Sequence, residues 1–157
     1  MNWTKQEFSF HDTQRLLFKL AERVKAFNGL TTNEISELLE SAEKCIYQPG
    51  QSIVSEGSVG MFMYIITDGE AVVTKKGRSG DAELATLGPT DSFGEMALAD
   101  RESRSATVTA KSECTLIRLS EKAIDTQPSI GLKVFRNICR VLSERLRNAD
   151  EQLVWRL

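Results

Sequence analysis

The residues best suited to chemistry lie in one stretch of the chain, residues 93–108. Gly94 can bring the backbone close to a ligand, and Glu95–Leu98 is predicted to form one helical turn whose free amide groups point at an anion. Nine positions after Glu95, Arg104 offers a planar fork of donors that suits two phosphate oxygens. Because Glu95 can also accept a hydrogen bond from a sugar hydroxyl, these groups together predict a site for a sugar phosphate.

The number of cations in this stretch limits the charge of the ligand. Only Arg104 is placed for phosphate, and the chain has neither a GxxxxGK[ST] loop nor an evident Asp cluster for magnesium. A singly charged phosphodiester therefore suits the site better than a triphosphate, and cyclic nucleotides carry that charge. The alternative is that Glu95 and Arg104 pair with each other as a partly buried ion pair and bind no ligand.

Short β-prone runs separated by turn residues must position this stretch. The predicted strands are Cys45–Tyr47, Ser52–Val54, Met61–Ile66, Ala71–Thr74, Glu83–Leu87, Ser105–Ala110 and Cys114–Leu119. Strands at this spacing are typical of a sandwich or a jelly-roll barrel. The basic turn at Lys75–Arg78 is expected to be solvated rather than to bind a partner.

Helical periodicity flanks the strands on both sides. Leu17, Leu20, Val24 and Phe27 predict a helix over about residues 13–27. Thr31 and Glu34 form a capping box at the start of a second helix that ends near residue 43. These features predict a mainly β fold: a jelly-roll β-barrel at residues 44–119, with N-terminal helices at 1–43 and a long C-terminal helix within 120–157, all in one domain.

The C-terminal helix begins after Pro128 and is amphipathic. Its apolar residues recur every three or four positions, at Phe135, Ile138, Leu142, Leu146, Ala149 and Leu153. A single barrel has limited surface to cover such a helix along its whole length. Two arrangements remain open: the helix packs only on its own barrel, or part of the stripe faces a second subunit in a homodimer.

Composition excludes several classes of function. The 157 residues carry 20 Lys and Arg against 22 Asp and Glu, which argues against a general nucleic-acid binder. A single His and three widely separated Cys residues predict no metal site, no disulfide framework and no catalytic triad, so we expect no enzyme. Cys45, Cys114 and Cys139 are predicted to be reduced core thiols. No signal peptide or membrane span is evident, which indicates a cytoplasmic protein.

The central stretch resembles a known family. Phe93–Leu98, followed by Arg104–Val108, is similar to the phosphate-binding cassette (residues 93–108 here) of cyclic nucleotide-binding domains, the family shared by catabolite activator protein and kinase regulatory subunits. Further segments that resemble the barrel turns of that family are Tyr47–Gly57, Tyr64–Glu70 and Leu87–Phe93. The resemblance spans about residues 18–150. Thr90 departs from it, because the family usually has a glycine at this turn, and a threonine adopts positive φ less easily.

The resemblance implies a role for each matching residue. Glu95 would bind the ribose 2′-hydroxyl and Arg104 the cyclic phosphate. The remaining site residues that it implies are Leu87 and Phe93 in the pocket wall, Gly94, and the backbone amides of Met96, Ala97, Ser105 and Ala106. Ser105 directly follows the cassette arginine, where Thr often accompanies cyclic GMP, so cyclic AMP is the expected ligand, although a serine hydroxyl can also meet guanine.

The function implied is a non-catalytic cyclic-nucleotide sensor whose C-terminal helix responds to ligand. Its expected partners are the nucleotide, a protein effector and a second copy of the chain, with no nucleic acid, membrane, metal or further cofactor. Two alternatives stay open: a ligand-free barrel that serves as a dimerisation or scaffold module, and a site for a larger cyclic dinucleotide, which would need further cations near the pocket.

Overall fold

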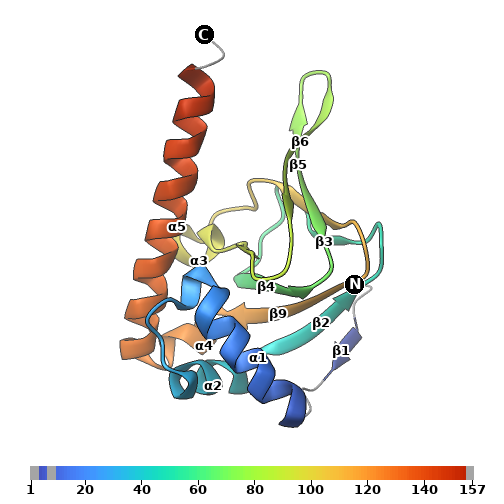
Figure 1. Cartoon of the computed structure of the whole chain (residues 1–157). Helices are drawn as coiled ribbons and strands as arrows, with labels where there is room; N and C mark the ends of the chain where they lie inside the picture. Colours follow the sequence, from blue (N-terminus) through green and yellow to red (C-terminus); the bar gives the residue numbers. More distant parts are fainter. Residues whose placement is uncertain (1–3, 7–9, 155–157) are drawn as a thin grey trace.

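The computed structural model describes residues 4–6 and 10–154, and two antiparallel sheets form its centre (Figure 1). The strands are β1 (Thr4–Gln6), β2 (Glu43–Tyr47), β3 (Ser52–Val54), β4 (Phe62–Asp68), β5 (Ala71–Gly77), β6 (Gly80–Leu87), β7 (Ser92–Phe93), β8 (Thr107–Ala110) and β9 (Cys114–Ser120). One sheet has the order β1-β2-β9-β4-β7 and the other β3-β8-β5-β6. All seven predicted strands are present, whereas β1 and β7 were not predicted.

Alternation along β4 and β9 gives the molecule two apolar cores. Tyr64 on β4 and Leu116 on β9 belong to the core between the sheets. Ile65 and Ile117, the next residue on each strand, belong to the core beneath the helices. Because successive side chains of a strand point to opposite faces, each of these central strands serves both cores.

The helices are α1 (Phe10–Arg23), the 3₁₀ helix η1 (Lys25–Phe27), α2 (Thr32–Glu40), α3 (Met96–Asp100), α4 (Glu121–Asp125) and α5 (Pro128–Val154). The predicted first helix is divided at Val24 into α1 and η1. The predicted capping box is present: Glu34 N donates to Thr31 Oγ1 at 3.2 Å, and Thr31 N donates to Glu34 Oε2 at 2.8 Å. The predicted class, mainly β with flanking helices and a long C-terminal helix, is confirmed.

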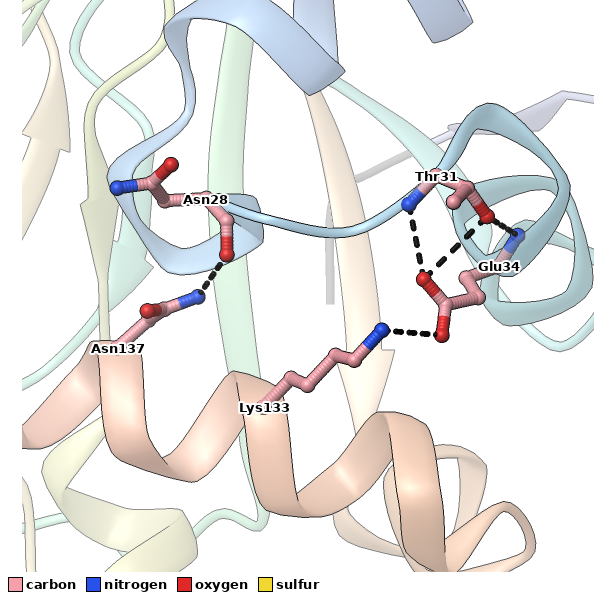
Figure 2. Close-up of polar contacts among 5 residues, drawn as sticks. All are labelled: Asn28, Thr31, Glu34, Lys133 and Asn137. Carbon is pink, nitrogen blue, oxygen red and sulfur yellow. Dashed lines mark hydrogen bonds and ion pairs between the residues drawn. The ribbon is translucent and has the colours of Figure 1, made fainter.

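Polar contacts attach α5 to the N-terminal helices (Figure 2). The buried side chain of Asn137 donates to the carbonyl oxygens of Asn28 at 2.7 Å and Ala26 at 3.2 Å. One turn earlier, Lys133 forms an ion pair with Glu34 at 2.6 Å. Because Asn137 satisfies two backbone carbonyls that have no helical partner, α5 is fixed to the segment around η1 as well as to the barrel.

Helix α5 has an inner and an outer apolar face. Val134, Ile138 and Val141 are buried, whereas Leu146 is exposed. The prediction that all three cysteines are core thiols is therefore wrong for Cys139, which is exposed. It follows buried Ile138, and one residue turns the side chain about 100° around a helix. No helix among the described residues is long and apolar enough to cross a membrane.

The turn between β6 and β7 contains a strained residue. Asp91 N donates to Gly88 O at 3.1 Å, and Thr90 lies at the third position of this turn with φ of 80°. With Pro89 at the second position, the pattern is that of a type II turn, in which the third residue is usually glycine. Thr90 therefore takes the positive φ that this turn requires, although its side chain is β-branched.

Replacing Thr90 by glycine should stabilise the fold. The Thr90→Gly change removes the steric cost of the left-handed backbone, which stabilises the fold. Glycine also makes the unfolded chain more flexible, which offsets part of this gain. We therefore expect a net increase of roughly 0.5–1 kcal/mol in the free energy of unfolding. Urea denaturation of the two proteins measures it. Thr90→Ala is the control, because it keeps a Cβ at the same φ and should give little gain. A less stable glycine variant would contradict the assignment of strain.

Candidate functional site

A cavity of about 290 Å³ lies between the barrel, the cassette and α5. Its lining includes all nine residues predicted for the site: Leu87, Phe93, Gly94, Glu95, Met96, Ala97, Arg104, Ser105 and Ala106. The inner wall is apolar, because strands β3, β5, β6 and β8 contribute Val54, Val73, Ala85 and Val108. The cavity thus combines one apolar wall with a wall of polar groups from the cassette, as small-molecule sites commonly do.

The Arg104 side chain is buried in this cavity and bonded to backbone carbonyls. Only 7% of the residue is exposed. Its Nη1 donates to Gly94 O at 2.8 Å and its Nη2 donates to Phe62 O at 2.7 Å. The guanidinium carbon lies 5.9 Å from the centre of the Tyr64 ring. Among the described residues, no carboxylate lies within ion-pair distance of Arg104, so its charge is held by neutral oxygens.

Burial lowers the pKa of Arg104, and the nearby Tyr64 and Glu95 partly offset this shift. An arginine nevertheless remains protonated in a protein, so the site retains a positive charge that water reaches poorly. Such a charge is unfavourable unless an anion or further hydrogen bonds compensate for it. Arg104 lines the cavity, so an anion that entered it could supply this compensation.

Gly94 is required by the position of Arg104. It adopts φ of 77°, and a Cβ built there would lie 2.5 Å from Arg104 Nη1 and 3.0 Å from Phe62 O. A Cβ at Gly60 would come within 3.2 Å of Arg104 Nη2. The prediction that Gly94 brings the backbone close to a ligand stays a prediction; the group that packs against Gly94 in the structure is the protein's own guanidinium.

Glu95 is almost completely buried and pairs with a residue that the sequence analysis missed. Its exposed fraction is 1%, and its Oε1 accepts from Arg145 Nη1 at 2.5 Å. The alternative that Glu95 pairs with Arg104 as an isolated ion pair is therefore wrong. Burial raises the pKa of Glu95, and the charge of Arg145 opposes that shift without cancelling it. Two effects thus act on the Glu95 carboxylate: burial disfavours its charged form, and the guanidinium of Arg145, from another element, stabilises that form.

Arg145 comes from α5, fifty positions after Glu95 in the chain. Its Nη2 also donates to Ser92 O at 2.7 Å, and 47% of its side chain is exposed. A signal for it exists in the sequence: Arg145 continues the inner stripe of Val134, Ile138 and Val141 at spacings of four, three and four. A charged residue in the core-facing stripe of a helix requires a buried partner. The partner's identity depends on the fold.

The part of the cassette that follows Glu95 and precedes Arg104 contains a short helix, α3. Leu98 N donates to Glu95 O at 3.1 Å, which confirms the predicted helical turn after Gly94. Ser105 and Ala106 follow Arg104 and lead into β8. Lys75 Nζ donates to Ser105 O at 2.8 Å, so this lysine of the basic turn contacts the cassette as well as solvent. Among the described residues, no group of three His, Cys, Asp or Glu side chains could hold a metal ion.

Comparison with known proteins identifies the family of the chain. The family model for the cyclic nucleotide-binding domain matches residues 44–127. The cAMP-dependent protein kinase regulatory subunit of Yarrowia lipolytica is 34% identical over 111 residues, which cover 71% of this chain and 29% of the relative. The cGMP-dependent protein kinase of Toxoplasma gondii is 33% identical over 148 residues, which cover 87% of this chain and 14% of the relative.

A solved structure is also similar in fold. The catabolite activator protein of Thermus thermophilus has a TM-score of 0.76 and 30% identity, and the match covers 82% of this chain and 61% of that one. This chain therefore spans less than two thirds of each of these three proteins. The residues that the family model matches make up more than half of the chain, and they include the whole cassette. The chain belongs to the cyclic nucleotide-binding domain family.

Proposed function

We propose that the chain is a non-catalytic regulatory module that binds a cyclic nucleotide, cyclic AMP in preference to cyclic GMP, in the cavity beside the cassette. The observation that carries this proposal is the guanidinium of Arg104, which is buried against backbone carbonyls and has no carboxylate partner among the described residues. One phosphodiester anion would neutralise that charge. The names of relatives specify cAMP in one case and cGMP in another, which supports the ligand class.

The polar and apolar walls of the cavity suit different parts of the nucleotide. The cyclic phosphate lies against Arg104, and the ribose 2′-hydroxyl donates to Glu95, whose Oε1 accepts from Arg145 and whose second oxygen is left for the sugar. The purine then lies along the apolar wall near Val73 and Leu87. In this pose the cyclic phosphate and the 2′-hydroxyl each meet a buried polar side chain.

The size of the cavity supports a mononucleotide over a cyclic dinucleotide. Its volume of about 290 Å³ is at the lower end of ordinary ligand pockets, which span about 300–1,000 Å³. The second cation that a dinucleotide would need is present as Arg145, but it is already paired with Glu95. The preference for adenine rests on Ser105, whose hydroxyl is also able to contact guanine.

Removing the Arg104 side chain should weaken binding more than any other single change in the site. A hydrogen-bonded charge is worth about 1.5–3 kcal/mol, so Arg104→Ala should raise the dissociation constant for cyclic AMP roughly 10- to 150-fold. Titration calorimetry with cyclic AMP and cyclic GMP measures this, with circular dichroism as the check on folding. Arg147→Ala, an exposed arginine on α5, is the control. Equal affinity in the Arg104 variant would refute the phosphate assignment.

Binding should depend on pH through Glu95. Burial raises the pKa of this carboxyl above its ordinary value of 4.5, and the protonated form is a poor acceptor for the ribose hydroxyl. Nucleotide binding favours the ionised form, so affinity should increase as the pH rises above 4.5 and level off once Glu95 is ionised. Calorimetry across this range tests it.

The control for this pH dependence is Glu95→Gln. Its amide oxygen still accepts from the sugar but does not titrate, so this variant should lose less affinity than Arg104→Ala and show a flat profile. The same pH dependence in the Gln variant would assign the titration to another group. A larger loss than for Arg104→Ala would reverse the ranking of the two contacts.

The response to ligand is proposed to pass from the cassette to α5 through Arg145. A ligand shifts a conformational equilibrium only when it binds the two states with different affinity. A nucleotide that contacts Glu95 alters the partner of Arg145 and therefore favours one pose of α5. The partners of α5 are then a second copy of the chain and an effector protein in the cytoplasm.

Hydrogen exchange of the α5 amides should report this link. We expect cyclic AMP to change the exchange of residues 140–154, and Arg145→Gln to reduce that change at saturating nucleotide, because glutamine cannot form the ion pair. Arg147→Gln, two positions later, should behave as the unsubstituted chain. An α5 response of full size in the Arg145 variant would exclude this ion pair as the connection.

The alternative function is a ligand-free scaffold that associates through α5. The specific observation in its favour is the exposed outer face of that helix. Calorimetry separates the two functions, because no heat with either nucleotide at millimolar concentration would favour the scaffold.

A further inference from the structure

A row of side chains crosses the five-stranded sheet and ends at the cassette. Glu43 on β2 lies opposite Arg118 on β9, and Arg118 lies opposite Tyr64 on β4. Tyr64 in turn lies opposite Phe93 on β7, the first residue of the cassette. Because residues directly opposite each other on neighbouring strands point to the same face, these four side chains share one face of the sheet. Tyr64 and Phe93 belong to the core between the sheets, so the row faces that core.

Arg118 is the charged residue of this row that the nucleotide pose does not use. Its side chain is only 12% exposed, and its Nη2 donates to Glu43 Oε2 at 2.5 Å. Although burial lowers the pKa of Arg118, the hydrogen bond and the charge of Glu43 raise it by more, so the guanidinium stays charged. A charged side chain on the inner face of a central strand is uncommon. Arg118 does not line the ligand cavity, so a role in binding would have to be indirect.

The guanidinium of Arg118 also lies over the ring of Phe62, at the start of β4. The distance from its central carbon to the ring centre is 4.3 Å. A cation over an aromatic face is attracted to it, and the attraction is stronger where water is excluded. Phe62 packs against the core between the sheets. The backbone carbonyl of this same residue accepts the hydrogen bond from Arg104 Nη2 at 2.7 Å.

Strand β4 also supplies the aromatic face beside Arg104. The Tyr64 ring lies 5.9 Å from the Arg104 guanidinium carbon and stacks on Phe93, with 5.1 Å between ring centres. Burial raises the pKa of Tyr64, and the charges of Arg118 and Arg104 both lower it, which indicates that both guanidiniums lie near this phenol. Arg118 is therefore next to both residues of β4 that hold Arg104.

We propose that Arg118 is a positioning residue for Arg104: anchored by Glu43, it holds the ring of Phe62 and thereby fixes the carbonyl that directs the Arg104 guanidinium. A guanidinium that is already fixed loses less conformational freedom when an anion binds, so Arg118 contributes to affinity without contacting the ligand. This inference rests on the proposed function in taking that ligand to be a cyclic nucleotide, whereas the order of the Arg104 side chain is measurable without any ligand.

Nuclear magnetic resonance of the nucleotide-free chain tests the positioning directly. The Nε–Hε signal of Arg104 is assigned by its absence in Arg104→Ala. We expect a high heteronuclear Overhauser effect for this signal, which reports a rigid side chain, and a clear decrease in Arg118→Met. Lys111→Met is the matched control, because it removes another barrel cation paired with a glutamate, Glu70, beyond the other end of β9. An unchanged Arg104 signal in Arg118→Met, or an equal decrease in the control, would overturn the proposal.

Calorimetry with cyclic AMP tests the consequence for binding. Arg118→Met should raise the dissociation constant roughly two- to tenfold. Because Arg118 acts through Arg104, adding Arg118→Met to Arg104→Ala should raise it no further. A general structural defect would instead weaken binding by the same factor in both backgrounds, and that result would reject the positioning role. Circular dichroism checks folding. Arg118→Lys, which keeps the charge, is the milder variant for the same cycle if the methionine variant unfolds.

Changes at Phe62 test the route between the two arginines. Phe62→Leu removes the ring but keeps the carbonyl, so it should weaken binding about as much as Arg118→Met, and the double variant should lose no more than either. Phe62→Tyr, which keeps a ring for Arg118, should recover most of the affinity that Phe62→Leu loses. Additive losses would mean that Arg118 does not act through this ring. If the unsubstituted chain binds neither cyclic AMP nor cyclic GMP, the proposed function is rejected, while the Arg104 signal still decides whether Arg118 positions that side chain.

Discussion

The site depends on a positive charge that is buried without a paired carboxylate among the described residues. Arg104 is held at its two terminal nitrogens by the carbonyl oxygens of Gly94 and Phe62. Carbonyl dipoles fix the direction of the guanidinium but do not neutralise it, and the close packing leaves no room for a side chain at Gly94. Structural arginines that are buried are normally paired with carboxylates. An arginine that is fixed in this way without a carboxylate partner is the feature on which the proposed anion site rests.

The second charged group of the cavity connects it to distant segments. Glu95 is bound by Arg145 of α5, and Asn137 of the same helix is bonded to the segment around η1. The cassette, α5 and the N-terminal helices are therefore joined by successive polar contacts, each of them buried or half-buried. A displacement of α5 must either break the Asn137 bonds or carry η1 with it. The proposed coupling between the cassette and α5 would thus act through identifiable bonds rather than through mere proximity.

Local sequence patterns predicted much of the fold, because each depends on residues close together in the chain. The strand alternation and the capping box at Thr31 are of this kind, and so is the turn after Gly94. The ion pair of Glu95 could not be predicted in the same way, since its partner comes from α5 and depends on how that helix crosses the barrel. Strand β7 was missed because its two residues are too short for any periodicity, and it exists through pairing with β4.

The prediction that Cys139 is a core thiol was wrong because the sequence alone does not show which face of α5 meets the core. A single amphipathic stripe predicts one apolar face, and it merges Ile138, which belongs to the helical core, with Leu146, which is exposed. The helix in fact has two apolar faces, and Arg145 lies at the boundary between them, next to exposed Leu146. Consecutive residues of a rigid helix cannot reorient independently. Whatever fixes Arg145 against the cassette therefore also fixes the angle at which Leu146 is presented, so the ligand cavity and the outer face of α5 share one helical turn.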